Sequence, residues 1–305
     1  MNNQMVYNEE LYRGKRINCS WTKKILMLLI RQPVVAGQFY NLNPNMLKRQ
    51  IDACFKHRIG PKRMEKRGMA AAVVPHAGFD YSGPIAAWIY SKMEQANYII
   101  IGPNHSGLGS QFAIMKSGLW KTPLGELLIH EEMANRLLER CRLLEYDVLA
   151  HQNEHSVEVQ LPFLQYRFGN DFKFIPISVL NEFVDDILLD ACKKIGKDIA
   201  EVIKKSKEKW IVIATSDFSH YISHQTANKV DKVCIKSILK LNEDDFFSKI
   251  NEKHASICGF GAIAIVISAA KELGAKKAEL LKYATSGDIT GELGSVVGYA
   301  SIIIY

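Results

Sequence analysis

Three apolar segments of the chain each end in a short polar motif that carries a histidine. The motifs are VPHAG with His76, GPNH with His105, and TSDFSH with Asp217 and His220. Each apolar run has the composition of a buried strand, and open α/β sheets bind ligands at the carboxyl ends of their strands. One such histidine is more often a hydrogen-bonded loop residue, but three of them predict a shared polar site.

His76, His105 and Cys258 have the donor atoms of a transition-metal site. Imidazole nitrogens and a thiolate are good ligands for zinc, iron or copper, and glycines near each residue let a ligand approach. Cys258 precedes Gly259 at a predicted helix start, where free N–H groups and the helix dipole favour a thiolate. The alternative is that Cys258 packs as a small buried apolar residue.

His220 and Asp217 share one loop after a strand, which favours a role in proton transfer. A histidine that titrates near neutral pH is a natural proton shuttle, and Asp217 would orient it or accept a backbone hydrogen bond. The alternative is a helix-capping aspartate followed by a surface histidine. We expect His220 to be the acid or base and Asp217 to support it.

Three further residues are candidates for substrate contact. Tyr81 comes shortly after His76 in the sequence, and its hydroxyl would contact a substrate. The alternative, that the tyrosine packs in the core, is equally common. His155, next to Glu154, either supports the site or caps a helix. Asp288 in TSGDITG either lines the cleft or serves as a turn aspartate.

Strands and helices alternate along the chain and predict the scaffold for these residues. A strand, a helix and a second strand at residues 70–101 form a βαβ unit, which is expected to be parallel and right-handed. Residues 110–130 are expected to form a β-hairpin or a loop excursion, and helices are expected at 131–144 and 185–205. We therefore expect a single α/β domain with a central, mainly parallel or mixed sheet flanked by helices.

Residues 1–30 differ from the remaining chain, residues 31–305. They are polar, then basic, and contain only the short apolar run ILMLLI, which is too short for a membrane span. We expect a disordered arm or a gene-start artefact there, with Met27 as an alternative start and residues 1–26 without a functional role. The α/β domain is expected to cover residues 31–305.

The net charge and the spacing of the cysteines limit the classes of protein to which the chain can belong. The formal charge of +7 comes from short, scattered clusters without interleaved aromatic residues, so no nucleic-acid partner is expected. The six cysteines lie far apart and include no CxxC motif, which is the pattern of a reduced, cytoplasmic protein. The chain also lacks a P-loop, a GxGxxG motif after a strand, a GxSxG elbow and an HExxH helix.

Nine sequence blocks resemble, in the same order, those of the Memo family. They are QPVVAGQFY, VPHAGFDYSG, IIIGPNHSG, WKTPLG, EHSVEVQLPFL, TSDFSHY, CGFGAI, TSGDITG and VVGYAS. The resemblance covers roughly residues 31–305. It implies an α/β fold similar to that of class III, extradiol-type non-haem iron dioxygenases.

The resemblance also implies roles for individual residues. His76 and His105 match the two histidine ligands of the dioxygenases, Cys258 stands where they have a carboxylate ligand, and His220 matches their acid/base histidine. A thiolate is softer than a carboxylate and shifts the preference toward copper or zinc, while iron also suits the site. The family further implies a functional link to an AMMECR-type domain protein and a radical SAM protein.

Three functions from different classes follow. The first is a metal-binding redox protein with one transition metal ion, iron or copper or zinc, and a small molecule or peptide as substrate. The second is a non-catalytic protein that binds a peptide or small acid in the same cleft. The third is a zinc hydrolase in which Asp217 or His220 activates water.

Overall fold

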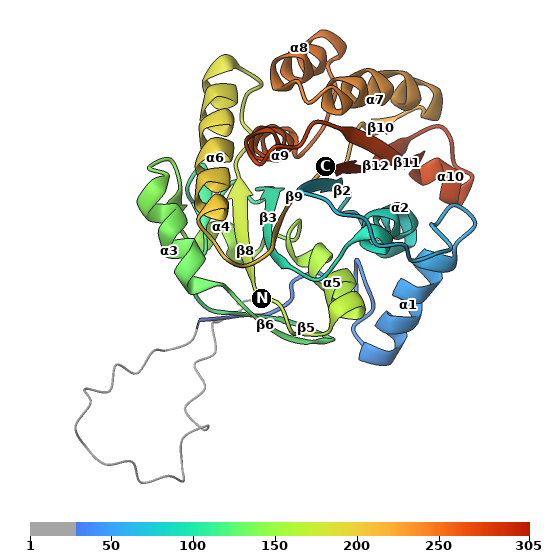
Figure 1. Ribbon diagram of the computed structural model, residues 1–305. Coiled ribbons are helices and arrows are strands. Elements are labelled where there is room, and N and C mark those ends of the chain that lie inside the picture. Colours follow the sequence, from blue (N-terminus) through green and yellow to red (C-terminus); the bar gives the residue numbers. More distant parts are fainter. Residues whose placement is uncertain (1–28) are drawn as a thin grey trace, which may run out of the picture.

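The computed structural model describes residues 29–305, which form one α/β domain with a mixed sheet, as the sequence predicts (Figure 1). The expected arm lies almost entirely in residues 1–28, outside the described residues. The strands are β1 (Ile30–Arg31), β2 (Ala71–Val74), β3 (Asn97–Pro103), β4 (Phe112–Ile114), β5 (Leu119–Thr122), β6 (Gly125–Leu128), β7 (Glu145–Tyr146), β8 (Phe174–Val179), β9 (Trp210–Thr215), β10 (His220–Ile222), β11 (Ala278–Thr285) and β12 (Val296–Ile304).

The main sheet has nine strands in the order β10-β12-β2-β9-β3-β8-β4-β7, and β11 pairs with β12. Its centre, β2-β9-β3-β8, is parallel, whereas β12 pairs antiparallel with β2, β10 and β11. A second sheet, β1-β5-β6, contains the expected hairpin as the antiparallel pair of β5 and β6. Three adjacent parallel strands, β2, β9 and β3, therefore end at the same edge.

Helices cover both faces of the main sheet. They are α1 (Pro44–Lys56), α2 (Phe79–Lys92), α3 (Glu131–Arg140), α4 (Leu149–Gln152), a 3₁₀ turn (Glu158–Gln160), α5 (Leu161–Phe168), α6 (Asp186–Lys204), α7 (His224–Leu239), α8 (Glu243–Lys253), α9 (Phe260–Glu272) and α10 (Ser286–Thr290). Successive side chains of a strand point to opposite faces of the sheet, so each strand contributes to two cores. Ile99 and Ile101 of β3 belong to the core formed with α3, α6 and α9, whereas Tyr98 and Ile100 belong to the core formed with α1, α2 and α5.

The sequence places the long helix α6 within one residue at each end, but it extends α3 too far. The helix ends at Arg140 rather than Leu144, because the chain there turns into the short strand β7. The buried residues of α6 lie on one face, and Asp185 caps its first turn by accepting the N–H of Leu188. Both helices are amphipathic and capped, but Cys141 and Leu144 stay buried in the turn after α3 and so continue the apolar pattern beyond the end of the helix.

Candidate metal centre

The site lies at the edge where β2, β9 and β3 end. His76 follows β2, Asp217 follows β9 and His105 follows β3, and β9 lies between the other two strands in the sheet. Strand order therefore brings together residues that are up to 141 positions apart in the chain. The loop before the 3₁₀ turn adds Glu154 and His155 to the same edge.

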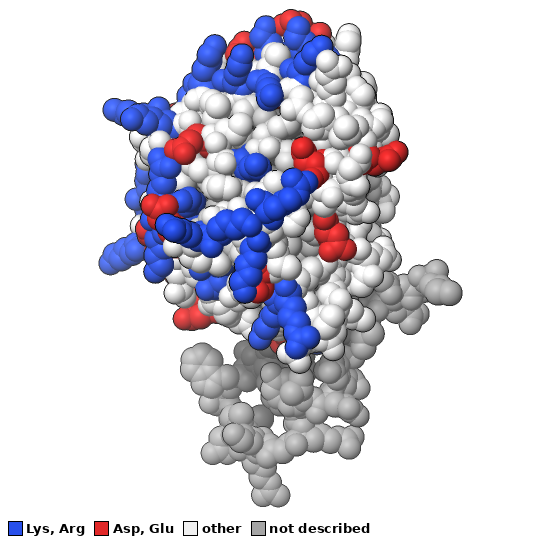
Figure 2. Space-filling model, turned by 90° about the vertical axis from the view of Figure 1, so that its right-hand side faces the viewer, with Lys and Arg blue, Asp and Glu red and all other residues white. Residues whose placement is uncertain are grey.

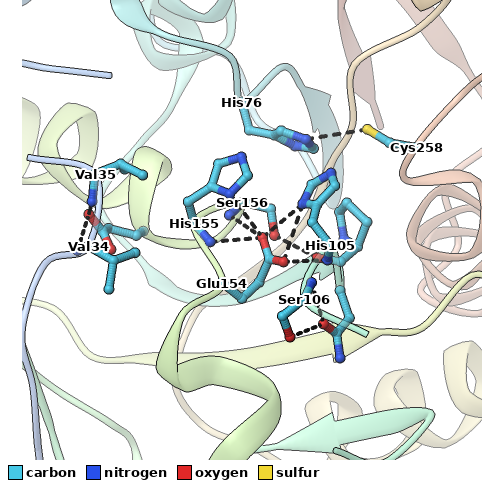
Figure 3. Close-up of polar contacts among 12 residues, drawn as sticks. Val34, Val35, His76, His105, Ser106, Glu154, His155, Ser156 and Cys258 are labelled. Atoms are coloured by element: carbon cyan, nitrogen blue, oxygen red, sulfur yellow. Dashed lines mark hydrogen bonds and ion pairs between the residues drawn. The ribbon is translucent and has the colours of Figure 1, made fainter. Parts of the chain in front are cut away.

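Three imidazole rings form a compact cluster (Figure 3). One ring nitrogen each of His76, His105 and His155 lies within 4.8 Å of the others. The rings of His105 and His155 stack at 4.8 Å, and the ring of His76 meets that of His105 edge-on at 5.2 Å. Three imidazole nitrogens at this spacing, in their neutral form, are a donor set suited to a transition metal ion.

Glu154 determines the orientation of His105. Its carboxylate accepts a hydrogen bond from His105 Nδ1 at 3.0 Å and another from the His105 backbone N–H. Since a carboxylate only accepts, Nδ1 carries a proton, so Nε2 is the nitrogen that offers a lone pair when the ring is neutral. Burial alone would lower the pKa of His105, but the hydrogen bond and charge of Glu154 raise it above the ordinary value.

The loop that carries Glu154 is organised around its carboxylate. Oε1 also accepts the backbone N–H groups of His155 and Ser156 at 2.8 and 2.7 Å. Burial would raise the pKa of Glu154, but the hydrogen bond from His105 and the neighbouring imidazoles hold it well below its usual range. Glu154 is therefore a buried carboxylate that holds the His105 ring and its own loop.

His76 is buried, and its contacts come from the end of β9, the loop after β9 and the loop before α9. Its Nδ1 lies 2.7 Å from the Thr215 hydroxyl, its backbone N–H donates to Asp217 Oδ1 at 2.9 Å, and its Nε2 lies 3.3 Å from the Cys258 sulfur. Burial, and then the nearby His105 and His155, hold the pKa of His76 well below its ordinary value. The ring is therefore neutral at pH 7, which is the form that binds metals.

Cys258 lies beside His76 rather than among the three rings. Its sulfur accepts the backbone N–H of Asp217 at 3.3 Å, and Asn181 donates to its carbonyl oxygen at 2.6 Å. The residue lies just before α9, as the sequence predicts. Burial first, and then the charge of Asp217, raise the pKa of the Cys258 thiol, so burial outweighs the expected effect of the helix N-terminus.

Asp217 and His220 have separate partners. Asp217 is buried and holds the His76 backbone, and burial raises its pKa to about 6. The His220 ring instead donates from Nδ1 to the Ser256 carbonyl oxygen at 2.6 Å, which leaves Nε2 free. The expected support of His220 thus comes from Ser256, because the loop before α9 packs closer to the ring than Asp217 does.

The two remaining candidates lie in the first turns of helices α2 and α10. Tyr81 is in the first turn of α2, with an exposed side chain. The Asp288 carboxylate accepts the Thr285 backbone N–H at 2.8 Å and caps α10. Its observed contacts are those of a capping residue.

A buried ionic network behind the cluster was not predicted from the sequence. Arg31 pairs with Glu158 at 2.7 Å and also donates to the carbonyl oxygens of His151 and Glu154. Glu158 also accepts the Tyr40 hydroxyl at 2.6 Å. The sequence signal that points to this network is the run EHSVEVQLPFL, in which polar residues alternate with apolar residues typical of a core.

Comparison with known proteins identifies relatives along nearly the whole described chain. The profile of the family described as Memo-like protein matches residues 31–303. A MEMO1 family protein of Methanopyrus kandleri is 41% identical over 282 residues, covering 90% of this chain and 98% of the relative. One from Pyrobaculum aerophilum is 44% identical over 284 residues, and one from Methanocaldococcus jannaschii is 42% identical over 289 residues; both alignments cover 90% of this chain and 99% of the relative.

A solved structure of an uncharacterized protein from Escherichia coli K12 is a more distant match. It is 12% identical, covers 77% of this chain and 100% of its own, and superposes with a TM-score of 0.47. Among residues 29–305, no helix has the length and apolar character needed to span a membrane.

Proposed function

The chain belongs to the Memo family, and we propose that it binds one transition metal ion at its histidine cluster and acts as a redox protein. The observation that carries this proposal is the convergence of His76, His105 and His155, with Glu154 holding the His105 ring in one tautomer. Paired carboxylate and histidine side chains of this kind are typical of metal sites in proteins.

The donor set fits a borderline metal. His76 and His105 would hold it, and either Cys258 or His155 would be the third ligand. With Cys258 the site favours copper or zinc, and with His155 it also suits iron. Once bound, the ion would supply a Lewis acid and a redox centre for a small molecule or peptide substrate.

Four residues around the histidine cluster have specific roles in this proposal. Glu154 holds a proton on Nδ1 of His105, so Nε2 is the nitrogen that faces a metal ion, and Asp217 fixes the backbone of His76. His220 accepts or donates a proton at Nε2, because its Nδ1–H is held by the Ser256 carbonyl oxygen. Tyr81, partly exposed in the first turn of α2, would contact the substrate.

Metal content tests the proposal. The protein would be reconstituted anaerobically with Fe(II), Cu(I) or Zn(II), and the bound metal measured by mass spectrometry. We expect close to one ion per chain in the wild type and none in His105→Ala, while His57→Ala, which removes a histidine at the far end of α1, should keep it. Equal metal in all three proteins would contradict a site at this cluster.

Two further variants identify the third ligand. Cys258→Ser should weaken the binding of copper and zinc if the sulfur is a ligand, whereas His155→Ala should weaken it if the imidazole is. Retention of metal by both single variants, together with its loss in the double variant, would mean that either residue can serve.

A non-catalytic binding function has one observation in its favour. The Cys258 sulfur is already in contact with His76 Nε2 and the Asp217 N–H, so these polar groups satisfy one another without an ion. A peptide or small acid would then bind to hydrogen-bonding histidines, and chelators would leave its affinity unchanged.

A cytoplasmic location is part of the proposal. The five cysteines in the described part of the chain are free, and four of them are buried. Free, buried cysteines are typical of proteins in reducing compartments.

A further inference from the structure

Helix α7 carries a single row of lysines on its solvent side. Lys229, Lys232 and Lys236 lie three and four residues apart, and Lys240 continues the row at the end of the helix. At this spacing all four side chains project from one face, and all four residues are exposed. Figure 2 shows that lysine and arginine cover much more than aspartate and glutamate on the side of the molecule to which α7 contributes.

No acidic side chain of the part of the chain that the structure describes pairs with this row. Within residues 29–305, none of the four lysines forms an ion pair, whereas α3 and α6 pair Arg136 with Glu132 and Lys194 with Asp198. Asp231 is the acidic residue of α7, but it is buried and accepts hydrogen bonds from Ser219 and Tyr283. Like charges at this spacing repel one another, so the solvent face of α7 is cationic at a cost to the helix.

An exposed apolar group lies at the N-terminal end of this row. Tyr221 is 79% exposed, directly after His220, and has a left-handed backbone with φ of 58°. The pairing of β10 with β12 shifts register at this residue, and such a bulge turns a side chain outward. Leu293 is 52% exposed, and its carbonyl oxygen accepts the N–H of His224 at the start of α7.

A hollow lies beside the first two lysines of the row. It has a volume of about 280 Å³ and is lined by His224, Gln225, Asn228, Lys229 and Lys232. The surface thus has an aromatic and aliphatic end, a hollow, and a straight cationic row. We refer to Tyr221, Leu293 and the four lysines as the α7 surface.

We propose that the α7 surface docks an acidic segment of another protein. A helix or extended strand with carboxylates at matching intervals pairs with the lysine row, and an apolar side chain of the same segment packs on Tyr221 and Leu293. The apolar end favours a protein over a nucleic acid, since protein interfaces combine an apolar core with a charged rim. A basic row along a helix is also found on nucleic-acid-binding proteins, so it is the exposed Tyr221 and Leu293 at the end of the row that favour a protein partner.

The α7 surface adjoins His220 of the candidate site, because Tyr221 is the next residue in the chain. Because the rings of His220 and Tyr221 lie 5.9 Å apart between their centroids, a segment packed on Tyr221 would end close to the His220 ring. The inference does not depend on metal binding, and it holds whether the histidine cluster is catalytic or not.

Fluorescence anisotropy with a defined peptide tests the proposal. The probe is a fluorescein-labelled helical peptide with four glutamates spaced as the lysines are and a Leu-Trp pair at one end, and a peptide of the same composition in scrambled order is the reference. The stripe variant is Lys229→Glu/Lys232→Glu/Lys236→Glu. The charge-matched control is Lys197→Glu/Lys205→Glu/Lys207→Glu, three exposed lysines of α6 and the turn after it that form no ion pair in the described part of the chain.

We expect the ordered peptide to bind more tightly than the scrambled one, and to bind the stripe variant at least roughly tenfold more weakly than the control variant. Tyr221→Ala should weaken the ordered peptide but not the scrambled one. Equal loss in both triple variants, or no binding of either peptide, would overturn the proposal. Binding of a 20-nucleotide DNA strand that is tighter than the peptide and is lost in the stripe variant would replace the acidic protein with a nucleic acid.

Discussion

The Glu154 carboxylate and the His105 ring, which are 49 residues apart in the chain, meet at 3.0 Å between Oε1 and Nδ1. The same carboxylate accepts the backbone N–H groups of three residues, so it holds a loop and a ring together. A buried acceptor with this many donors is both a structural and an electrostatic element of the site.

Replacing Glu154 with glutamine tests this double role. Glutamine keeps the shape but loses the charge, and its amide cannot accept from every donor that the carboxylate satisfies. We expect the affinity for the preferred metal to fall by about 10–100-fold, the range typical of such supporting carboxylates. Competition with a chelator of known affinity measures the change. Glu65→Gln, an exposed carboxylate paired with Lys92, is the control and should leave the affinity unaltered.

Arg31 is expected to be essential for stability. Its guanidinium group donates to Glu158 and to the carbonyl oxygens of His151 and Glu154, and it lies 4.0 Å over the ring of Trp120. Arg31→Met leaves the Glu158 carboxylate buried and unpaired, which costs about 3–5 kcal/mol of unfolding free energy. Arg31→Lys should cost less, since it keeps the charge but loses the forked geometry.

Urea denaturation measures both changes against an exposed pair. Arg67 and Glu279 also meet at 2.7 Å, but both side chains are partly exposed. Arg67→Met should cost about 1 kcal/mol or less. Similar losses for Arg31→Met and Arg67→Met would show that the buried network does not have the importance we assign to it.

The apolar strands made part of the site predictable. A run such as AAAVVP indicates where a buried strand ends, and parallel strands end at a common edge, so His76, His105 and Asp217 could be placed at one site without knowledge of the strand order. The alternation of side chains likewise predicts helices on both faces. These inferences use local pattern and a general property of parallel sheets.

The contacts between loops could not be predicted from local sequence pattern. His220 finds its partner at Ser256, and His105 finds Glu154, through loops whose paths depend on the packing of several helices. Burial of the Cys258 thiol likewise depends on the surrounding fold, so its pKa is raised although its position before a helix suggests the opposite. Residue type and spacing identify candidates, but only the packed structure decides their partners.

The buried His151 should make stability depend on pH. Burial, and then the charge of Arg31, lower its pKa from 6.5 to about 4. Between these values the unfolded chain binds a proton that the folded chain does not, so stability is greatest above pH 6.5 and falls as the pH drops toward 4. The full effect is about 3 kcal/mol. The unfolding free energy of His151→Phe should fall less between pH 7 and pH 5 than that of the wild type, and equal slopes would contradict this assignment.

Gly102 is expected to be required for the close approach of the site loops. A methyl group at this position in β3 would overlap the Ser156 hydroxyl and lie 2.9 Å from Thr215 Cγ2. Ser156 follows His155, and Thr215 contacts His76, so Gly102→Ala should push two cluster residues away from His105. We expect a loss of about 1–3 kcal/mol in stability and weaker metal binding.

Two controls separate crowding at the site from a general effect of the added methyl group. Gly68→Ala places its methyl in open space and should leave both the unfolding free energy and the metal affinity close to the wild type. Ser156→Ala in the Gly102→Ala background removes the hydroxyl that the new methyl meets first, so it should restore part of both losses. If Gly102→Ala binds metal as tightly as the wild type, the close packing of β3 against the two loops is not what positions the histidines.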